Sequence, residues 1–262
     1  MLEIDNLSVE YKKDQPVLNI IKFRLDKGEK IVILGPNGSG KTTLIRAILG
    51  LVKSRGIVKI NGRTLKEIKC DLSVSANLEE IYSLLYLNVR DLISLYADLK
   101  ACDEKHILDY IRSFGLMDIF DKKLWQLSTG QRKLLTNILT IASGGKMLLF
   151  DEVFDGVDPP RKLKLAWILN EIEASILLTT HELGMLKHFE HWGLYFMFDG
   201  HLFGKITPLS KILDTGIVMG YESNAIITLK AANKELSLVP KAGRPLRDFM
   251  DLNVLYEELV MS

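Results

Sequence analysis

The chain has 262 residues, of which 47% are hydrophobic, and its 34 basic and 33 acidic residues leave a formal net charge of +1. This length allows one large α/β domain or a core with an added subdomain. The balanced charge gives no general argument for a nucleic acid or anionic lipid partner. Cys70 and Cys102 form no CxxC pair, which favours two reduced thiols in a cytosolic protein.

No apolar stretch of the sequence approaches the roughly 18 residues that a membrane-spanning helix needs. The start, MLEIDNLSVEYKK, is polar and alternating, so we predict no signal peptide. We therefore expect a chain that does not cross a membrane but is able to bind a protein that does.

The first sixty residues predict a β-rich segment. Apolar residues alternate over 2–11 with one break, and over 21–25 between charged residues. Asn61–Gly62 is a pair typical of a β-hairpin turn. Between these segments, KIVILGPNGSGKTTLIRAILG (30–50) predicts a buried strand, a glycine-rich loop and a helix that ends at Gly50.

The middle of the chain changes character. After a strand candidate, DLSV (71–74), residues from about 78 to 142 lack strand signals and predict several helices. MLLF (147–150) and SILLTT (175–180) then predict short buried strands with a helix between them. Alternation of strand and helix favours a parallel sheet that is covered on both faces.

The last seventy residues predict a strand and a separate extension. WGLYFMF (192–198) reads as a buried strand. AIITLK (225–230) and ELSLVP (235–240) predict two short strands, and an amphipathic stretch follows at 246–260.

GPNGSGKT (35–42) matches the phosphate-loop pattern GxxxxGK[ST]. The backbone N–H groups of such a loop and of the following helix bind phosphate oxygens, and its glycines let the backbone bend and approach the anion. Lys41 would reach the β- and γ-phosphates, and the Thr42 hydroxyl would complete a Mg²⁺ shell. The position between a strand and a helix disfavours a plain glycine-rich turn. The predicted phosphate-binding residues are Gly35, Pro36, Asn37, Gly38, Ser39, Gly40, Lys41, Thr42 and Thr43.

Two further strands end in reactive side chains. Asp151 and Glu152 follow MLLF, and His181 follows SILLTT. Ligands of open parallel sheets bind at the carboxyl ends of the strands. Asp151 suits the Mg²⁺ shell, and Glu152 suits the polarisation of a water that attacks the γ-phosphate. Acidic pairs and histidines at strand ends are each common. The prediction of a catalytic site therefore depends on their occurring together with the phosphate loop.

The histidines predict no further metal site. His181-Glu182 would need a second histidine at position 185 for the HExxH zinc motif, and Met185 stands there. We expect no metal other than the Mg²⁺ that accompanies the nucleotide.

Residues 124–135, LWQLSTGQRKLL, predict a helix that begins near Ser128–Gly130. A helix N-terminus presents N–H groups and a positive dipole, which favour an anion. The phosphate loop already provides one anion-binding site. The second site therefore raises the question of which molecule supplies the anion that it binds.

In order and spacing, these motifs resemble the ATP-binding subunit of ABC transporters over about residues 1–205. GPNGSGKTT resembles the Walker A motif, MLLFDE the Walker B motif with its catalytic glutamate, and LSTGQ the signature motif. DGVD (155–158) resembles the D-loop, TTHEL the switch-histidine loop, and Tyr11 the aromatic residue that stacks on adenine.

The resemblance implies an α/β fold: a P-loop NTPase core with a parallel sheet, an N-terminal antiparallel β-subdomain and a helical subdomain inserted at about 78–142. Residues 206–262 would form a small C-terminal extension of strands and a helix. The helical region around LNVRDLISLYADL resembles exporter subunits, so we favour an exporter.

The resemblance also implies partners. The chain would bind and hydrolyse ATP with Mg²⁺, using Glu152 and His181. Two subunits would face each other head to tail, as a homodimer or a heterodimer, with each ATP held by the Walker motifs of one and by Ser128, Gly130, Gln131 and Asp158 of the other. The dimer would drive an integral membrane subunit from the cytoplasmic face of the cell membrane, without nucleic acid.

Two alternatives stay open at this point. A soluble ABC ATPase could power assembly or remodelling without a membrane partner, and a degenerate module could bind ATP without hydrolysing it. Glu152 and His181 argue against the second alternative.

Two positions depart from the family pattern. Thr129 replaces the first glycine of the signature, and no glutamine occurs between Gln15 and Gln126, so the Q-loop glutamine is absent. Asn77 is the nearest amide in register, and we predict it as the substitute ligand near Mg²⁺. Ala76 aligns equally well, Glu79 and Glu80 compete for the role, and the remaining alternative is that nothing replaces the glutamine.

Overall fold

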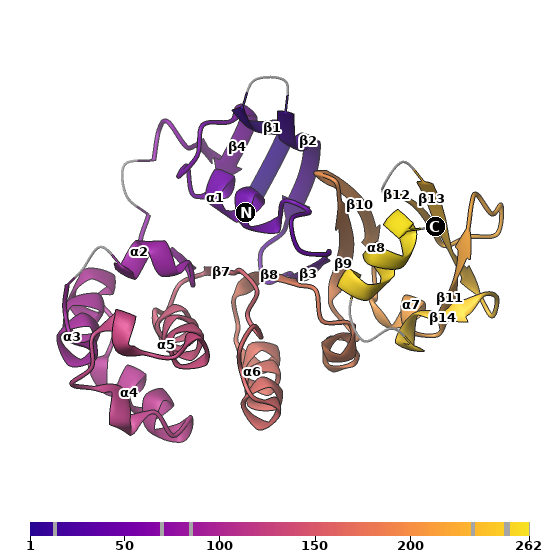
Figure 1. Cartoon of the computed structure of the whole chain (residues 1–262). Helices are drawn as coiled ribbons and strands as arrows, with labels where there is room; N and C mark the ends of the chain where they lie inside the picture. The colour runs from indigo at the N-terminus through magenta and orange to yellow at the C-terminus, as the bar shows by residue number, and fades with distance from the viewer. Residues whose placement is uncertain (13–14, 69–70, 84–85, 232–233, 249–251, 262) are drawn as a thin grey trace. The chain divides into compact units, whose positions relative to one another are not determined.

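The computed structural model describes all residues except 13–14, 69–70, 84–85, 232–233, 249–251 and 262. The chain forms two compact units (Figure 1): unit 1 consists of Met1–Lys69 and Leu177–Ser262, and unit 2 of Cys70–Ile176. The predicted domain boundary near residue 205 stays a prediction.

Unit 1 begins with an antiparallel sheet in the strand order β2-β1-β4-β5. Its strands are β1 (Leu2–Lys12), β2 (Gln15–Leu25), β4 (Arg55–Ile60) and β5 (Arg63–Thr64). The predicted break in the first strand is confirmed at Asn6, which has φ 52° where the register shifts. The predicted turn is also confirmed: Asn61 and Gly62 both have positive φ, as a two-residue hairpin turn requires.

Unit 1 also holds the strand that carries the phosphate loop. Buried β3 (Lys30–Leu34) runs parallel to β9 (Gly193–Phe198), which pairs antiparallel with β10 (His201–Ile206). β8 (Ser175–Thr180), whose last residues lie in this unit, is the other neighbour of β3. Helix α1 (Lys41–Ile48) follows β3, and a 3-10 helix, η3 (Leu183–His188), follows β8. β3 and β9 are each buried at every position but one, so they form part of the core behind the loop.

The C-terminal part of unit 1 is a second antiparallel sheet in the order β12-β13-β11-β14. It confirms both predicted strands, but the sequence did not indicate β10 or β11. Its elements are α7 (Ser210–Leu213), β11 (Thr215–Met219), β12 (Ile227–Ala231), β13 (Lys234–Pro240), β14 (Arg244–Pro245), η4 (Leu246–Asp248) and α8 (Leu252–Met261).

Unit 2 contains the short parallel pair β6 (Val74–Ala76) and β7 (Met147–Phe150) and the predicted run of helices. The helices are α2 (Glu79–Ser83), α3 (Val89–Lys100), α4 (Glu104–Ser113), η1 (Met117–Ile119), η2 (Leu124–Gln126), α5 (Thr129–Ala142) and α6 (Pro159–Glu171).

The strand predicted at 71–74 is wrong in its position, since β6 begins only at Val74. The Asp71 carboxylate accepts hydrogen bonds from the backbone N and the hydroxyl of Ser73, at 3.0 and 2.5 Å. This local bonding closes a turn, which competes with strand pairing.

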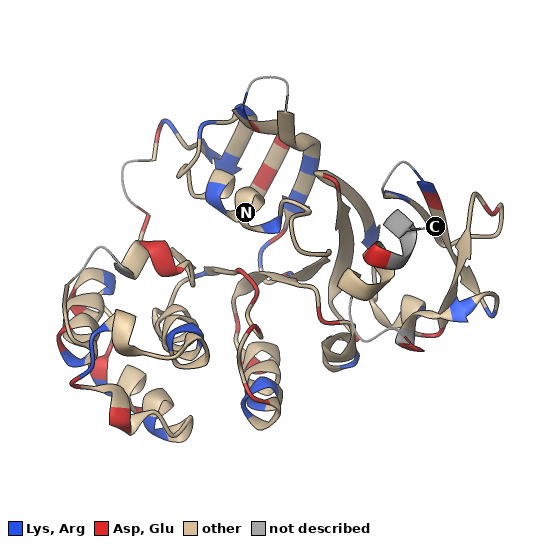
Figure 2. Ribbon diagram, in the orientation of Figure 1, with Lys and Arg blue, Asp and Glu red and all other residues tan. Residues whose placement is uncertain are grey.

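Charged residues of both signs are interspersed along the elements of each unit (Figure 2), in keeping with the small net charge. Within the described part of the chain, no helix has both the length and the apolar character needed to cross a membrane. Cys102 is a free thiol, and Cys70 lies outside the described residues.

Candidate active site

The phosphate loop connects β3 to α1 and is shaped by close backbone packing. A Cβ on Gly35 would lie 2.4 Å from the Met197 carbonyl oxygen, so only glycine fits there. The Lys41 side chain is buried, and its Nζ donates to the carbonyl oxygens of Gly35 and Pro36 at 2.6 and 2.8 Å. The loop therefore folds around the Lys41 ammonium group, which the sequence predicts to bind the phosphates.

Helix α1 begins at an N-terminus that no side chain caps. Its N-cap residue is Gly40, with φ 108°, which is a left-handed conformation that glycine adopts readily. A helix N-terminus without a capping side chain is the kind of end that commonly binds phosphate.

Tyr11 and His181 also lie in unit 1. Tyr11 is 55% exposed, and its hydroxyl lies 3.4 Å from the Thr43 hydroxyl on α1. His181 follows β8 and is half-buried, and the Thr180 carbonyl accepts a hydrogen bond from Gly35 N at 3.1 Å. Tyr11, the candidate for adenine stacking, therefore lies next to helix α1. The end of β8, which His181 follows, lies next to the phosphate loop.

In unit 2, a tight turn after β7 carries the acidic pair. Asp151 is buried and Glu152 is half-buried, and the Glu152 carbonyl accepts a hydrogen bond from Asp155 N at 3.1 Å. Glu152 has φ 45°, a left-handed conformation that costs a non-glycine residue roughly 1–2 kcal/mol. Such strain persists only where the surroundings enforce it, and it is frequent at functional sites.

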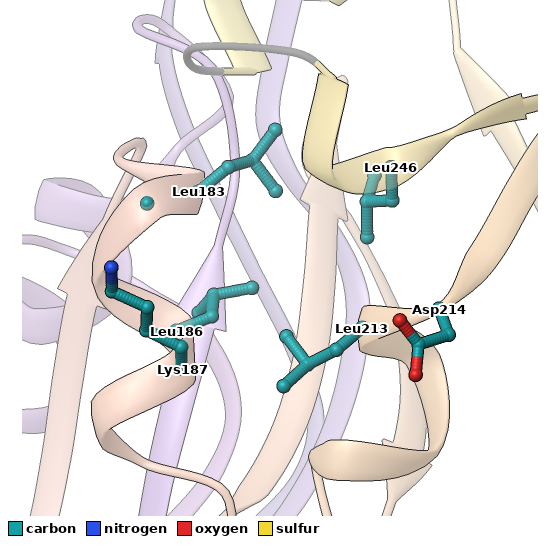
Figure 3. Close-up of a pocket in the computed structure, with 7 residues that line it drawn as sticks. Leu183, Leu186, Lys187, Leu213, Asp214 and Leu246 are labelled. Carbon is teal, nitrogen blue, oxygen red and sulfur yellow. The ribbon is translucent and has the colours of Figure 1, made fainter.

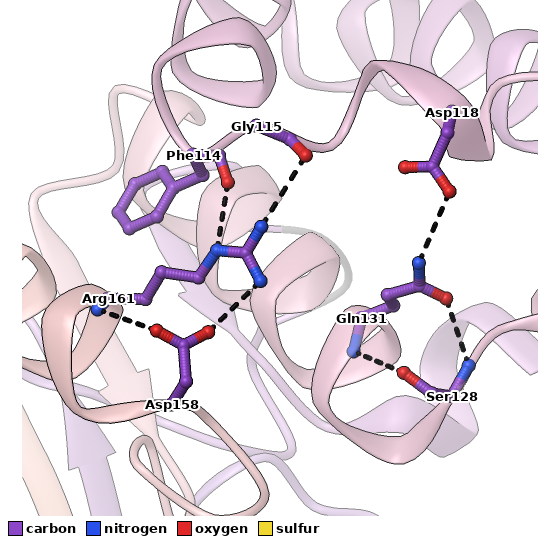
Figure 4. A network of polar contacts seen from close by, with 7 residues as sticks. All are labelled: Phe114, Gly115, Asp118, Ser128, Gln131, Asp158 and Arg161. Carbon is purple, nitrogen blue, oxygen red and sulfur yellow. Dashed lines mark hydrogen bonds and ion pairs between the residues drawn. The ribbon is translucent and has the colours of Figure 1, made fainter.

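The signature segment forms the predicted helix N-terminus, with Ser128 as the N-cap of α5. Its hydroxyl accepts a hydrogen bond from Gln131 N, and the Gln131 side-chain oxygen accepts one from Ser128 N (Figure 4). Gln131 thus closes a capping box. A Cβ on Gly130 would lie 2.2 Å from the Gly156 carbonyl oxygen, which explains the glycine.

A model of the family described as ABC transporter matches residues 18–155, which include the phosphate loop, the signature segment and the acidic pair. The chain belongs to the ABC transporter family. Within this family it is the ATP-binding subunit, an ATPase that hydrolyses ATP for transport.

Similar proteins agree with this assignment. The energy-coupling factor transporter ATP-binding protein EcfA1 of Fusobacterium nucleatum is 30% identical over 194 residues, which cover 69% of this chain and 73% of the relative. The taurine import ATP-binding protein TauB of Escherichia coli O157:H7 is 30% identical over 192 residues, which cover 70% of this chain and 74% of the relative.

A solved structure has a closely similar fold. It is provisionally named a cobalt transport ATP-binding protein, is 34% identical and has a TM-score of 0.90, with 98% of this chain and 99% of that chain covered. None of these three names refers to export, so they do not support the predicted preference for an exporter.

The D-loop residue of this ABC subunit has partners within its own chain. The Asp158 carboxylate is the N-cap of α6 and also pairs with the Arg161 guanidinium, whose Nη1 lies 3.0 Å away (Figure 4). Arg161 Nε also donates to the Phe114 carbonyl at 2.9 Å. The nucleotide contact predicted for Asp158 stays a prediction beside this structural role.

Asn77, the residue predicted to replace the Q-loop glutamine, has partners within its own chain. The Asn77 side chain is completely buried, and its Nδ2 donates to Asn137 Oδ1 at 2.7 Å and to the Asp151 carbonyl at 3.1 Å. Its Oδ1 accepts a hydrogen bond from Asp151 N at 2.6 Å. Protein groups bind both amide hydrogens and one lone pair of the oxygen, so the amide has a structural role inside the chain, and the Mg²⁺ contact of Asn77 stays a prediction beside it.

The sequence did not indicate that helix α8 reaches the Walker A loop. Asn253 Oδ1 accepts a hydrogen bond from Asn37 N at 2.7 Å, and Leu252 N donates to the His181 carbonyl at 3.1 Å. The Tyr256 hydroxyl donates to the Asp199 carboxylate at 2.7 Å. This hydrogen bond and partial burial raise the pKa of Tyr256 to about 12. An isolated asparagine in an amphipathic stretch carries no signal that would have identified this contact.

Unit 1 also contains a cavity of about 320 Å³ (Figure 3). Leucine side chains from η3, α7 and η4 line most of it, with Lys187 and Asp214 as its charged residues. It contains none of the residues that the family resemblance assigns to ATP.

Proposed function

We propose that this chain closes with a second nucleotide-binding subunit around two ATP molecules and so drives a separate integral membrane subunit from the cytoplasmic face. The observation that most directly supports this proposal is the phosphate loop, which leads into an N-terminus of α1 that no side chain caps. The relative TauB is a taurine import protein, which favours import over export.

The proposed residue roles follow from their chemistry. Lys41 binds the β- and γ-phosphates. The Thr42 hydroxyl and the Asp151 carboxylate are hard oxygen donors of the kind that Mg²⁺ prefers. Among the described residues, no group of three or more His, Cys, Asp or Glu gathers. A Mg²⁺ that the nucleotide brings would neutralise charge on the phosphates.

Glu152 is the proposed general base, and His181 assists in the hydrolysis step. Glu152 takes a proton from the attacking water, and its strained backbone directs the carboxylate independently of a regular strand or helix. Glu152→Gln keeps the shape and removes the base. ATP turnover is expected to fall by about 10²- to 10⁴-fold while ATP binding survives and ATP-bound dimers accumulate.

Turnover is measured as phosphate release and binding by equilibrium titration. Glu173→Gln, a charge-neutralising change at an exposed glutamate of unit 2, is the control and is expected to keep normal turnover. Turnover of Glu152→Gln within twofold of the unaltered chain would remove Glu152 from the mechanism.

The helical elements of unit 2 are the proposed docking face for the membrane subunit. A depression of about 90 Å³ is lined by Glu79, Tyr82, Leu124, Trp125, Arg132 and Thr136. Trp125 is 54% exposed and packs edge-on against the exposed Tyr86, with ring centroids 5.6 Å apart. Exposed aromatic residues beside a pocket are typical anchors of protein interfaces.

Docking is tested by co-sedimentation of the full chain with membranes of its source cells. Trp125→Ala is expected to lower the bound fraction several-fold. Trp167→Ala, at another exposed tryptophan of unit 2, is the matched control. If the unaltered chain itself stays in the supernatant, the soluble ABC ATPase becomes the better proposal.

A further inference from the structure

Two buried asparagines surround the turn that carries Glu152. β6 runs parallel to β7 with Ala76 opposite Leu149, and Asn77 N donates to the Leu149 carbonyl at 3.2 Å. β7 then ends at Phe150. At the next residue, Asp151, the Asn77 side chain replaces the backbone as the partner. Its Nδ2 donates to the Asp151 carbonyl, and its Oδ1 accepts from Asp151 N. A carboxamide carries the same donor and acceptor as a peptide group, so it extends the strand pairing by one residue.

Asn137 of helix α5 completes the arrangement on the other side of Glu152. Its Nδ2 donates to the Val153 carbonyl at 2.8 Å, and its Oδ1 accepts from Asn77 at 2.7 Å. These bonds fix both amide orientations, because a backbone N–H must face an oxygen and a carbonyl must face a nitrogen. Lys133 Nζ adds a bond to the Asp151 carbonyl at 3.2 Å.

The burial of this pair requires an explanation. Asn77 and Asn137 are both 0% exposed, and the neighbouring buried positions of α5 include Leu134 and Ile138. A buried amide is unfavourable unless its hydrogen bonds are all made, and an apolar side chain would fill the same space without that requirement. A fully bonded polar pair, by contrast, imposes one geometry on the backbone that it contacts.

We propose that Asn77 and Asn137 are positioning residues for ATP hydrolysis. They hold the carbonyls of Asp151 and Val153, on either side of Glu152, and thereby maintain its left-handed backbone and the direction of its carboxylate. Asn77 thus acts on the catalytic turn. This inference rests on the proposed role of Glu152 as the base.

The first test separates positioning from binding. In the full chain, Asn77→Leu and Asn137→Leu remove the hydrogen bonds at similar side-chain size. Each is expected to lower kcat for ATP by about 10- to 100-fold, because small misplacements of a reacting group have effects of this order, while KM for ATP stays within about twofold. Thr140→Val, at another buried residue of α5, whose hydroxyl donates to the Thr136 carbonyl and touches neither Asp151 nor Val153, is the control and should keep kcat.

The second test asks whether the asparagines act through Glu152. In a Glu152→Gln chain the base is already absent, so Asn77→Leu should lower the residual turnover by less than about twofold. An equal loss of kcat with and without Glu152, or an unchanged kcat in Asn77→Leu, overturns the inference. If Asn77→Leu does not fold, Asn137→Ser gives the same comparison, since it frees the Val153 carbonyl and leaves the bonds between Asn77 and Asp151.

The two proposals fail in different ways. If Glu152→Gln retains full turnover, the proposed base is wrong. If Glu152→Gln is inactive and both asparagine variants keep a normal kcat, only the positioning role is wrong.

Discussion

The Walker A loop and the signature segment both lead into a helix N-terminus, yet the two ends are built differently. α1 begins behind Gly40 without a side-chain cap, whereas α5 begins behind Ser128 and is closed by a capping box with Gln131. The α1 end has no side-chain cap, whereas the α5 end satisfies part of its N–H groups with its own side chains. This difference fits an ATP held by the chain itself at α1 and an ATP brought by a partner subunit to α5.

The largest effect is expected from a negative charge at the α5 end. Aspartate is as good an N-cap as serine, so Ser128→Asp keeps the helix while placing a carboxylate where the proposed partner subunit would bring its γ-phosphate. Like charges in a closed interface cost several kcal/mol, so ATP turnover should fall by at least about 10²-fold while ATP binding to the single subunit is unchanged. Ser128→Asn is the neutral cap of matching shape and should retain most turnover in the same phosphate-release assay.

A mixture of subunits tests whether Ser128 acts on the partner's ATP. Combining Ser128→Asp with Lys41→Ala subunits places both defects on one composite site and leaves the other intact. Recovery of turnover in the mixture is expected, and its absence would contradict the head-to-tail arrangement. Gly130→Asp is a poorer choice, because any side chain there meets the Gly156 carbonyl of the same chain at 2.2 Å.

A second pair of variants examines the phosphate loop before α1, where glycines allow close backbone packing and left-handed conformations. Gly35→Ala is expected to lower the free energy of unfolding by about 3 kcal/mol, since its Cβ would lie 2.4 Å from the Met197 carbonyl oxygen. Gly38→Ala meets nothing within 4 Å and has only its φ of +80° to accommodate, at about 1 kcal/mol. Denaturant unfolding of both variants measures the difference, and equal losses would show that close approach is not what requires Gly35.

The two helix ends also show what the sequence predicts well. The Walker A loop is contiguous, so residues 35–43, the strand before it and the helix after it follow from one segment. The capping box is equally local, because Ser128 and Gln131 are three residues apart. The sequence therefore predicted both helix starts and the β-strands that carry Asp151 and His181.

Contacts between distant segments could not be predicted in this way. The bond between Asn77 and Asn137 joins residues 60 positions apart, and the bond between Asn37 and Asn253 joins residues 216 apart. Neither asparagine pair has a spacing that marks it, so the sequence placed Asn77 near Mg²⁺ by alignment alone. The strand at 71–74 was misplaced because the bonding of Asp71 to Ser73 outweighs the strand pattern.

A third prediction concerns the nucleotide base beside α1. The aromatic ring of Tyr11 is expected to stack on adenine, which is worth on the order of 1–3 kcal/mol per base. Tyr11→Ala should therefore weaken ATP binding about 10-fold or more with little change in kcat. Tyr11→Phe loses only the contact of the hydroxyl with Thr43 and should bind ATP nearly as well. Equal affinities of all three chains in an equilibrium titration would assign the adenine contact to another residue.

The smallest effect concerns helix α8, which contacts the Walker A loop through Asn253. Tyr256 on this helix donates to Asp199, and its pKa is raised to about 12 in the folded chain, against about 10 in an unfolded one. Between these values the unfolded chain loses this proton first, so the stabilisation is complete below about pH 10 and is lost as the pH rises toward 12. Denaturant unfolding across this range should show a shallower loss of stability in Tyr256→Phe than in the unaltered chain. Tyr221→Phe, at an exposed tyrosine of the same unit, should follow the unaltered chain. Parallel curves for Tyr256→Phe and the unaltered chain would mean that the hydrogen bond to Asp199 does not stabilise α8 beside the loop.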